Sequence, residues 1–221
     1  MTRPGFAIRG FYAVLDRDDE ALARTLALAA GILQLRLKPT SETLDASTLV
    51  RVARMARAVC DELGAALVIN DRLDVALAVH ADGVHLGQSD LPIAAARALA
   101  GRRLSIGVST HNLEQVCAAC AAGADYLGFG PVFATATKRN PDPVQGLVGL
   151  RLAVAASRVP VVAIGGITPD VAAAVYATGA AAICAISSVN DAHDVASAAA
   201  RFAYRSGLPY PIQHIANDSK S

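Results

Sequence analysis

Runs of basic or acidic residues are absent from this chain. It carries 20 Lys and Arg against 19 Asp and Glu, which gives a formal net charge of +1. A protein that holds nucleic acid or a membrane surface electrostatically usually gathers Lys and Arg into a patch or stretch. We therefore expect no nucleic-acid partner and no membrane partner. A small anionic ligand remains compatible, because it needs only a few local cations.

Cysteine is also scarce. The four cysteines lie in apolar surroundings, which is typical of reduced thiols in a cytoplasmic protein: Cys60, Cys117, Cys120 and Cys184. Cys117 and Cys120 form a C-x-x-C pair inside an alanine-rich helical stretch, and no second pair completes a metal site. We predict small buried core residues at these positions, in preference to a redox or metal site.

Long hydrophobic runs are missing too. The N-terminal residues, MTRPGFAIRGFYAVLD, contain no apolar stretch of the length that a signal peptide needs. The longest nearly apolar run, Val171 to Ile186, is broken by Thr178-Gly179. It divides more naturally into a helix and a strand than into a membrane span, so we expect a cytoplasmic location.

Eight short apolar runs, separated by helical segments, dominate what is present. They have the length and composition of strands buried on both faces. They are Phe11–Leu15, Ile32–Leu37, Ala66–Ile69, Gly83–Leu86, Leu104–Val108, Tyr126–Phe129, Val161–Ile164 and Ala182–Ile186. Eight alternating strand–helix units predict an α/β fold, a single (β/α)8 TIM barrel. An open doubly wound sheet would need a glycine-rich turn after the first strand, where residues 16–20 are acidic instead.

One domain accounts for most of the 221 residues, of which 53% are hydrophobic. We find no interdomain linker and predict a catalytic barrel over residues 1–206. The last segment, 207–221, is polar and interrupted by proline, so we predict a loosely ordered tail outside the barrel.

Polar residues follow nearly every predicted strand. In a parallel barrel the carboxyl ends of the strands form one mouth, where active sites are built. Alternation along the second strand places the hydrogen-bond donors Gln34, Arg36 and Lys38 on one face. The residues at seven of the eight ends include Gln34, Arg36, Lys38, Asn70, Asp71, Gln88, Asp90, Ser109, Thr135, Thr137, Lys138, Gly165, Gly166, Ser187 and Ser188.

The charges in this set divide by sign. Arg36, Lys38 and Lys138 are cations suited to phosphate. Asp71 and Asp90 are carboxylates that end adjacent strands, and Mg²⁺ typically binds a few carboxylates together with substrate phosphate. The alternative for both aspartates is the capping of a following helix.

Two phosphate sites are therefore predicted in one mouth. Gly165-Gly166 and Ser187-Ser188 follow strands seven and eight, where barrels often bind a monophosphate through backbone N–H groups. The side with the cations and the metal suits a diphosphate.

Two histidines lie near the predicted mouth. His85 falls within the fourth strand, where packing is the default role, and His111 follows the fifth strand close to Ser109. No Ser-His-Asp or Cys-His arrangement is evident, so we do not expect covalent catalysis.

Several long segments, taken in order, resemble the thiamine-phosphate synthase (thiamine-phosphate pyrophosphorylase) family. They are QLRLK (34–38), INDRLDVALAVHADGVHLGQSD (69–90), IGVSTH (106–111), YLGFGPVFATATK (126–138), VVAIGGIT (161–168) and AISS (185–188). The match covers about residues 11–188. It implies a transferase that joins 4-amino-2-methyl-5-(diphosphooxymethyl)pyrimidine to a (carboxy)thiazole ethyl phosphate and releases pyrophosphate. A homo-oligomer is compatible with the sequence, which leaves the oligomeric state open.

The resemblance also implies roles for individual residues. The pyrimidine diphosphate would be held by the motif Gln34, Leu35, Arg36, Leu37 and Lys38 together with Asn70, Ser109 and Lys138. Among these, Arg36, Lys38, Lys138 and Ser109 would serve catalysis. The metal Mg²⁺ would be held by Asp71 and Asp90, and the thiazole phosphate by Thr135, Thr137, Gly166, Ile186 and Ser187.

The chain departs from the family pattern at Leu37, where an acidic residue is usual, and at Ala134, where a proline is expected. Two rival functions share the barrel. A thiazole tautomerase would need the monophosphate site and an acid–base group such as His111, but not the metal carboxylates. A phosphate-ligand sensor would need no turnover at all.

Overall fold

The computed structural model describes residues 6–37, 45–135 and 142–203 as a closed barrel of eight parallel strands. The strands are β1 (Gly10–Leu15), β2 (Ile32–Leu35), β3 (Ala66–Asn70), β4 (Gly83–Leu86), β5 (Ser105–Thr110), β6 (Tyr126–Phe129), β7 (Val161–Ile164) and β8 (Ala182–Cys184). Each pairs with its neighbours in sequence, and β8 closes on β1. The predicted (β/α)8 barrel is confirmed.

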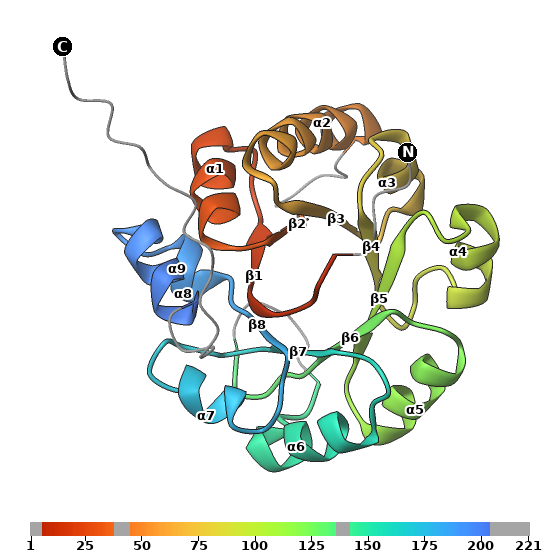
Figure 1. Ribbon diagram of the computed structural model, residues 1–221, viewed down its shortest axis with the longest axis vertical. Coiled ribbons are helices and arrows are strands. Elements are labelled where there is room, and N and C mark those ends of the chain that lie inside the picture. The colour runs from red at the N-terminus through yellow and green to blue at the C-terminus, as the bar shows by residue number, and fades with distance from the viewer. Residues whose placement is uncertain (1–5, 38–44, 136–141, 204–221) are drawn as a thin grey trace.

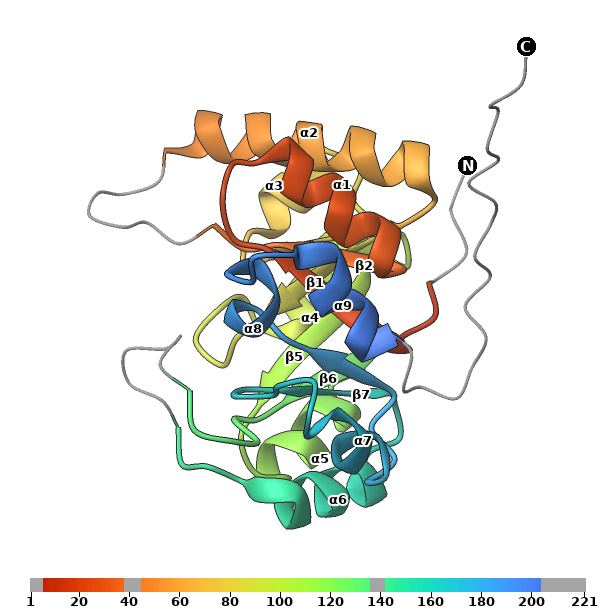
Figure 2. The same cartoon turned by 90° about the vertical axis from the view of Figure 1, so that its left-hand side faces the viewer.

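Helices surround the strands on the outside (Figure 1; Figure 2). They are α1 (Glu20–Ala29), α2 (Ala46–Leu63), α3 (Leu73–Ala78), α4 (Ile93–Ala100), α5 (Leu113–Ala121), α6 (Gly146–Ala156), α7 (Ala172–Tyr176), α8 (Ser187–Asn190) and α9 (Val195–Ala203). No helix among these described segments has the length and apolar character needed to cross a membrane. The predicted tail, 207–221, lies outside the described residues.

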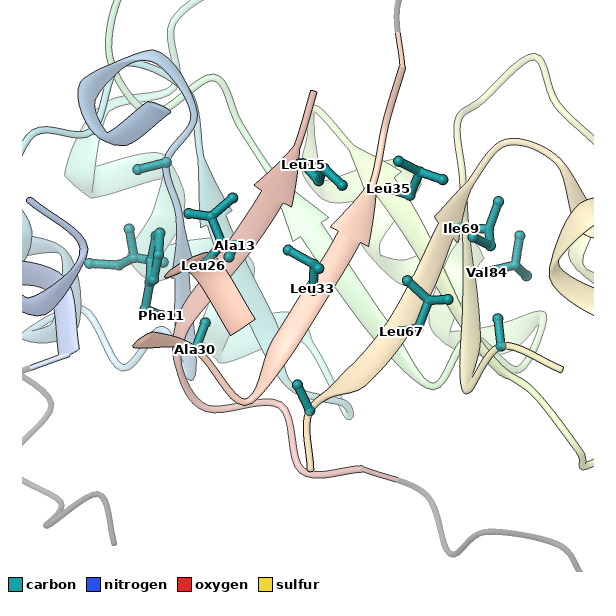
Figure 3. Close-up of a cluster of buried hydrophobic side chains, with 14 of the residues drawn as sticks. Phe11, Ala13, Leu15, Leu26, Ala30, Leu33, Leu35, Leu67, Ile69 and Val84 are labelled. Atoms are coloured by element: carbon teal, nitrogen blue, oxygen red, sulfur yellow. The ribbon is translucent and has the colours of Figure 1, made fainter. Parts of the chain in front are cut away.

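The outward faces of the strands form the larger core. Leu33, Leu35, Leu67 and Ile69 point from β2 and β3 toward the helices and are essentially inaccessible to solvent. Figure 3 shows these side chains beside those of β1 and α1. Phe11 of β1 belongs to the same outer core and stacks on Phe202 of α9, with ring centroids 5.4 Å apart. Burial of this continuous apolar layer favours the closed barrel.

The inward faces carry a second, smaller cluster, because successive strand side chains alternate between helices and barrel interior. Tyr12, Ile32, Val68, Tyr126 and Val162 pack together there, with Phe6 from the N-terminal segment against them. The Phe6 ring meets that of Tyr126 edge to face at 6.4 Å. This cluster fills the interior below the mouth, so the polar groups above it lie on a packed floor.

Two aspartates fasten the amino-terminal side of the barrel in the same way. The Asp82 carboxylate accepts hydrogen bonds from the Leu67 backbone N–H at 2.8 Å and from Arg57 Nη1 at 2.6 Å. The Asp125 carboxylate accepts the equivalent hydrogen bonds, from the Ile106 backbone N–H and from the Arg97 guanidinium. Each carboxylate ties a helix to a strand pair, which rigidifies the scaffold that presents the mouth.

Some details differ from the sequence-based expectations. Strand β2 ends at Leu35 and not Leu37, because its partner β1 ends at Leu15, opposite Leu35. Strand β8 ends at Cys184, because Ile186 already precedes helix α8 with ψ of −83°. Cys117 is exposed and not buried, since the core-facing positions of α5 are Val116 and Ala119.

Candidate active site

The carboxyl ends of the strands enclose a cavity of about 680 Å³, to which all eight strands or the loops after them contribute. This volume is within the range usual for small-molecule sites. Ten of the site residues predicted from sequence line it: Gln34, Arg36, Asn70, Asp71, Asp90, Ser109, Thr135, Gly166, Ile186 and Ser187. The structure therefore brings the two sets of ligand-type residues into one space.

Other predicted site residues lie elsewhere. Leu35 is buried in the outer core, and Leu37 packs against the same layer, so neither side chain lines the cavity. Lys38, Thr137 and Lys138 lie outside the described residues. Of the three predicted cations, Arg36 is therefore the one that lies in the described part of the cavity.

Asp71 and Asp90 form a pair of carboxyl groups at one side of the mouth. Asp71 follows β3 with a left-handed backbone (φ 62°), a conformation that residues other than glycine seldom adopt and that concentrates at functional sites. Its N–H donates to the His85 carbonyl oxygen at 2.7 Å, which fixes the turn. Asp90 is anchored through its Oδ2, which accepts the Gly87 N–H at 2.6 Å.

Asp90 perturbs the carboxyl group of Asp71. Partial burial, followed by hydrogen bonding and repulsion from Asp90, raises the pKa of Asp71 from 3.8 to about 6, while Arg36 and Asn70 oppose the rise. Neither aspartate is the N-cap of the next helix, since α3 begins after Arg72 and α4 after Pro92. The capping alternative is therefore excluded, and the pair remains as two hard oxygen donors side by side.

These donors suit a divalent cation. Within residues 6–37, 45–135 and 142–203, no cluster of three or more His, Cys, Asp or Glu side chains offers a complete metal cage. Two carboxylates at an open mouth fit Mg²⁺, which keeps water and takes phosphate oxygens as its other ligands. A cation there would also relieve the repulsion that raises the pKa of Asp71.

A line of hydrogen bonds crosses the floor of the cavity. Gln34 Nε2 donates to the Tyr12 hydroxyl at 3.0 Å, and the hydroxyls of Tyr12 and Tyr126 lie 2.9 Å apart. The Tyr126 hydroxyl is 3.2 Å from His85 Nδ1, and His85 Nε2 is 2.9 Å from Ser109 Oγ. Five side chains from five strands are thereby connected.

Burial keeps this line uncharged. The surrounding protein lowers the pKa of His85 to about 4 through desolvation, with a smaller contribution from Arg36. Desolvation likewise raises the pKa of the Tyr12 and Tyr126 hydroxyls well above their ordinary value. The floor therefore offers neutral donors and acceptors, which suit a neutral heterocycle better than an ion.

Glycines make room for these rings. Gly107 of β5 lies between His85 and Tyr126 in the sheet register, so the two rings meet over a position that lacks a side chain. A Cβ on Gly107 would lie 2.1 Å from Tyr126 Cζ, and one on Gly128 would lie 3.1 Å from His85 Cε1. Small residues at these positions are therefore required by the shape of the floor.

The opposite side of the mouth is formed by the loops after β6, β7 and β8. Gly165 and Gly166 both have positive φ, 98° and 63°, and a Cβ on Gly166 would lie 2.3 Å from the Ala134 carbonyl oxygen. Ser188 Oγ donates to the Ile167 carbonyl oxygen at 3.0 Å and joins the last two loops. These contacts hold backbone groups close to the cavity.

His111 joins two other loops at the mouth. Its Nδ1–H donates to the Gly130 carbonyl oxygen at 2.6 Å, and its Nε2 lies 3.5 Å from Asp142 Oδ2. The ring lines the cavity but is committed to these two contacts. Its placement favours support of the loops over action as a free acid or base.

Sequence reasoning missed Tyr12 and Tyr126 and left the direction of His85 open. All three line the cavity. The available signal was the alternation of side chains along a strand, which places Gly83 and His85 on one face of β4, and Gly107 and Ser109 on one face of β5. The glycines on these faces leave space for larger neighbouring side chains.

Fold and site together define a (β/α)8-barrel enzyme with a polar ligand cavity at the carboxyl ends of its strands. Residues 11–189 match the family model described as thiamine monophosphate synthase. The chain belongs to this family. It is accordingly a transferase of thiamine biosynthesis, as the resemblance implied.

Individual relatives agree. The chain is 46% identical over 175 residues to a thiamine-phosphate synthase of Moorella thermoacetica, covering 79% of this chain and 82% of the other. It is 47% identical over 183 residues to that of Methanoregula boonei, covering 83% of each. A solved thiamine phosphate pyrophosphorylase from Pyrococcus furiosus superposes with a TM-score of 0.81 at 37% identity, covering 90% and 95% of the two chains.

Proposed function

We propose that this cavity joins an aminopyrimidine methyl diphosphate to a thiazole ethyl phosphate, with Mg²⁺ held by Asp71 and Asp90. The observation that carries the proposal is the pair of apposed carboxyl groups beside Arg36, in the same cavity as Gly166 and Ser187. The first group suits a metal-bound diphosphate, and the second suits a monophosphate.

The diphosphate would lie between the carboxylates and Arg36. Bound Mg²⁺ supplies positive charge to the pyrophosphate oxygens. Arg36 adds a guanidinium suited to paired phosphate oxygens, and Lys38 and Lys138, which lie outside the described residues, are predicted to add two more cations. Asn70, at the end of β3, lines the cavity beside Asp71.

The aminopyrimidine ring would lie over the neutral floor. Gln34 and Ser109 are the members of the hydrogen-bond line that occur in the predicted pyrimidine site. An amide and a hydroxyl match the ring nitrogens and amino group of a neutral aminopyrimidine. The absence of charge on His85 and the tyrosines avoids a mismatch with that ring.

The thiazole phosphate would occupy the other side of the cavity, near Thr135, Gly166, Ile186 and Ser187. The hydroxyls of Thr135 and Ser187, with backbone N–H groups of the glycine loop, are suitable donors to phosphate oxygens. Thr137, also predicted for this site, lies outside the described residues.

The chemistry then needs charge neutralisation and positioning. The bond between the pyrimidine methylene carbon and oxygen breaks, and its electron pair leaves with pyrophosphate. The electron-rich aminopyrimidine supports the resulting cation, and the lone pair of the thiazole nitrogen forms the new C–N bond. Arg36 would stabilise the departing charge, and the shared cavity would hold the two substrates together. Little acid–base work is required, in agreement with a neutral floor.

Pyrophosphate release tests this proposal against the tautomerase. It would be measured with both substrates, with each alone and with Mg²⁺ withheld. Release that requires both substrates and Mg²⁺ supports the synthase reaction. Isomerisation of the thiazole without any release would point to a tautomerase instead, which has no use for the Asp71–Asp90 pair. Binding of either phosphate without turnover would point to a sensor.

A further inference from the structure

The hydrogen bonds across the cavity floor can be followed from donor to acceptor in one direction, from Gln34 to Ser109. Four of its five side chains, Gln34, Tyr12, Tyr126 and His85, are at most 9% exposed. Water therefore has little access to replace any of these bonds. Each hydroxyl carries one proton. If its oxygen accepts a hydrogen bond from one neighbour in the line, its own proton is free to be donated to the other neighbour.

The order can be followed from the amide. Gln34 Nε2 can only donate, so the Tyr12 oxygen accepts at 3.0 Å and its own proton is left for the Tyr126 oxygen at 2.9 Å. Tyr126 then donates to His85 Nδ1 at 3.2 Å. A neutral imidazole that accepts at Nδ1 carries its proton on Nε2.

The last step reaches the cavity. His85 Nε2–H donates to Ser109 Oγ at 2.9 Å, so the serine proton cannot point back toward the histidine. Ser109 is half-buried and lines the cavity, so this proton is directed at whatever binds there.

We propose that Tyr12 and Tyr126 are positioning residues that transmit the orientation of the Gln34 amide to His85 and thereby make Ser109 a hydrogen-bond donor to the pyrimidine diphosphate. The identity of that acceptor rests on the proposed function, but the direction of the line does not. The reverse order, in which Ser109 donates to His85 and Tyr12 donates to the Gln34 oxygen, would make Ser109 an acceptor.

A simpler role for the tyrosines is to fill the barrel. Both rings belong to the inner cluster, and Tyr126 also packs against Phe6. Replacement by Phe separates the two roles, because it keeps the ring and removes only the hydroxyl. A filling role predicts that His85 and Ser109 are unaffected by Tyr126→Phe.

The direct test is the His85 tautomer in the substrate-free protein, measured by long-range ¹H–¹⁵N NMR with ¹⁵N-labelled histidine and assigned with His85→Gln. We expect a proton on Nε2 in the unaltered protein and a mixture of tautomers in Tyr126→Phe. A proton on Nδ1 in the unaltered protein, or the same tautomer in Tyr126→Phe, overturns the proposal. Because no substrate is present, failure of the proposed function would leave this result standing.

Kinetics provide the second readout. Tyr126→Phe and Tyr12→Phe should each lower kcat about five- to tenfold with little change in KM, the effect of one neutral hydrogen bond. Added to Ser109→Ala, Tyr126→Phe should cost nothing further, whereas independent effects that multiply would refute the coupling. Tyr176→Phe is the matched control, since its hydroxyl bonds the Phe202 carbonyl oxygen outside the barrel. It should leave both the tautomer and kcat unchanged.

Discussion

Replacing Asp71 with Asn should stabilise the metal-free protein. Ionised Asp71 is unfavourable in the fold, because partial burial and the adjacent Asp90 raise its pKa from 3.8 to about 6. This destabilisation is absent at a pH below the pKa of Asp71 in the unfolded chain and fully present above its pKa in the folded protein. It therefore grows as the pH rises from about 4 to about 6. Asn removes the charge and tolerates the left-handed backbone of this position (φ 62°).

The size of the effect follows from the pKa. A change from 3.8 to about 6 is worth about 3 kcal/mol if it acts undiminished, at about 1.36 kcal/mol for each pKa unit. The burial of Asp71 is only partial and solvent reaches the residue, so screening reduces this to about 1 kcal/mol. In a chain of this size that corresponds to a rise in Tm of about 2–4 °C.

Thermal unfolding followed by circular dichroism, with a chelator at pH 7.5 and at pH 4, measures this directly. The gain from Asp71→Asn should be present at pH 7.5 and absent at pH 4. Added Mg²⁺ should raise the Tm of the unaltered protein at pH 7.5 but not that of the variant. Asp74→Asn is the control, since the Arg72 guanidinium lowers the pKa of Asp74, and it should give no gain and normal protection by Mg²⁺. A loss of Tm in Asp71→Asn at pH 7.5, or unchanged protection by Mg²⁺, would refute the reasoning.

Three further predictions concern other parts of the barrel. Ser187→Ala should raise KM for the thiazole phosphate about tenfold through loss of a hydrogen bond to a charged group, with KM for the pyrimidine unchanged in steady-state kinetics. Gly107→Ala should lower the free energy of unfolding by about 1–3 kcal/mol in urea, because its Cβ would lie 2.1 Å from Tyr126 Cζ. Asp82→Asn should cost about 1.5–3 kcal/mol in the same assay by weakening the bonds to Arg57 and the Leu67 N–H, while KM stays unchanged.

The strand pattern could be predicted from sequence because each strand is buried on both faces. Such strands are apolar at nearly every position, and glycines such as Gly64 end the helices between them in the left-handed conformation. Strand ends were harder to predict. Leu37 continues the local apolar pattern, but β1 has already ended at Leu15, opposite Leu35. Ile186 also continues it, but β7 ends at Ile164, opposite Cys184, and helix α8 begins at Ser187.

Which residues line the cavity could be predicted for those that follow a strand. All strands of a parallel barrel point the same way, so the residues at their carboxyl ends meet at one mouth. Asp71 and Asp90 lie together for that reason. Their roles, and those of the other predicted ligands, stay predictions. Residues inside the strands were less predictable, because a tyrosine or histidine at an alternate position suits either the outer core or the interior. Which face it occupies depends on closure of the barrel and on space left by Gly107 and Gly128.

The central claim is that one cavity joins two phosphorylated heterocycles with the help of a metal held by two aspartates. The most direct test is to incubate the protein with both substrates, with Mg²⁺ and with a chelator, and to identify the product by mass spectrometry. The account predicts thiamine phosphate in the presence of Mg²⁺, its loss with the chelator and its return when Mg²⁺ is restored in excess. Formation of the product at the same rate without a divalent cation, or no product from the two substrates, would contradict it.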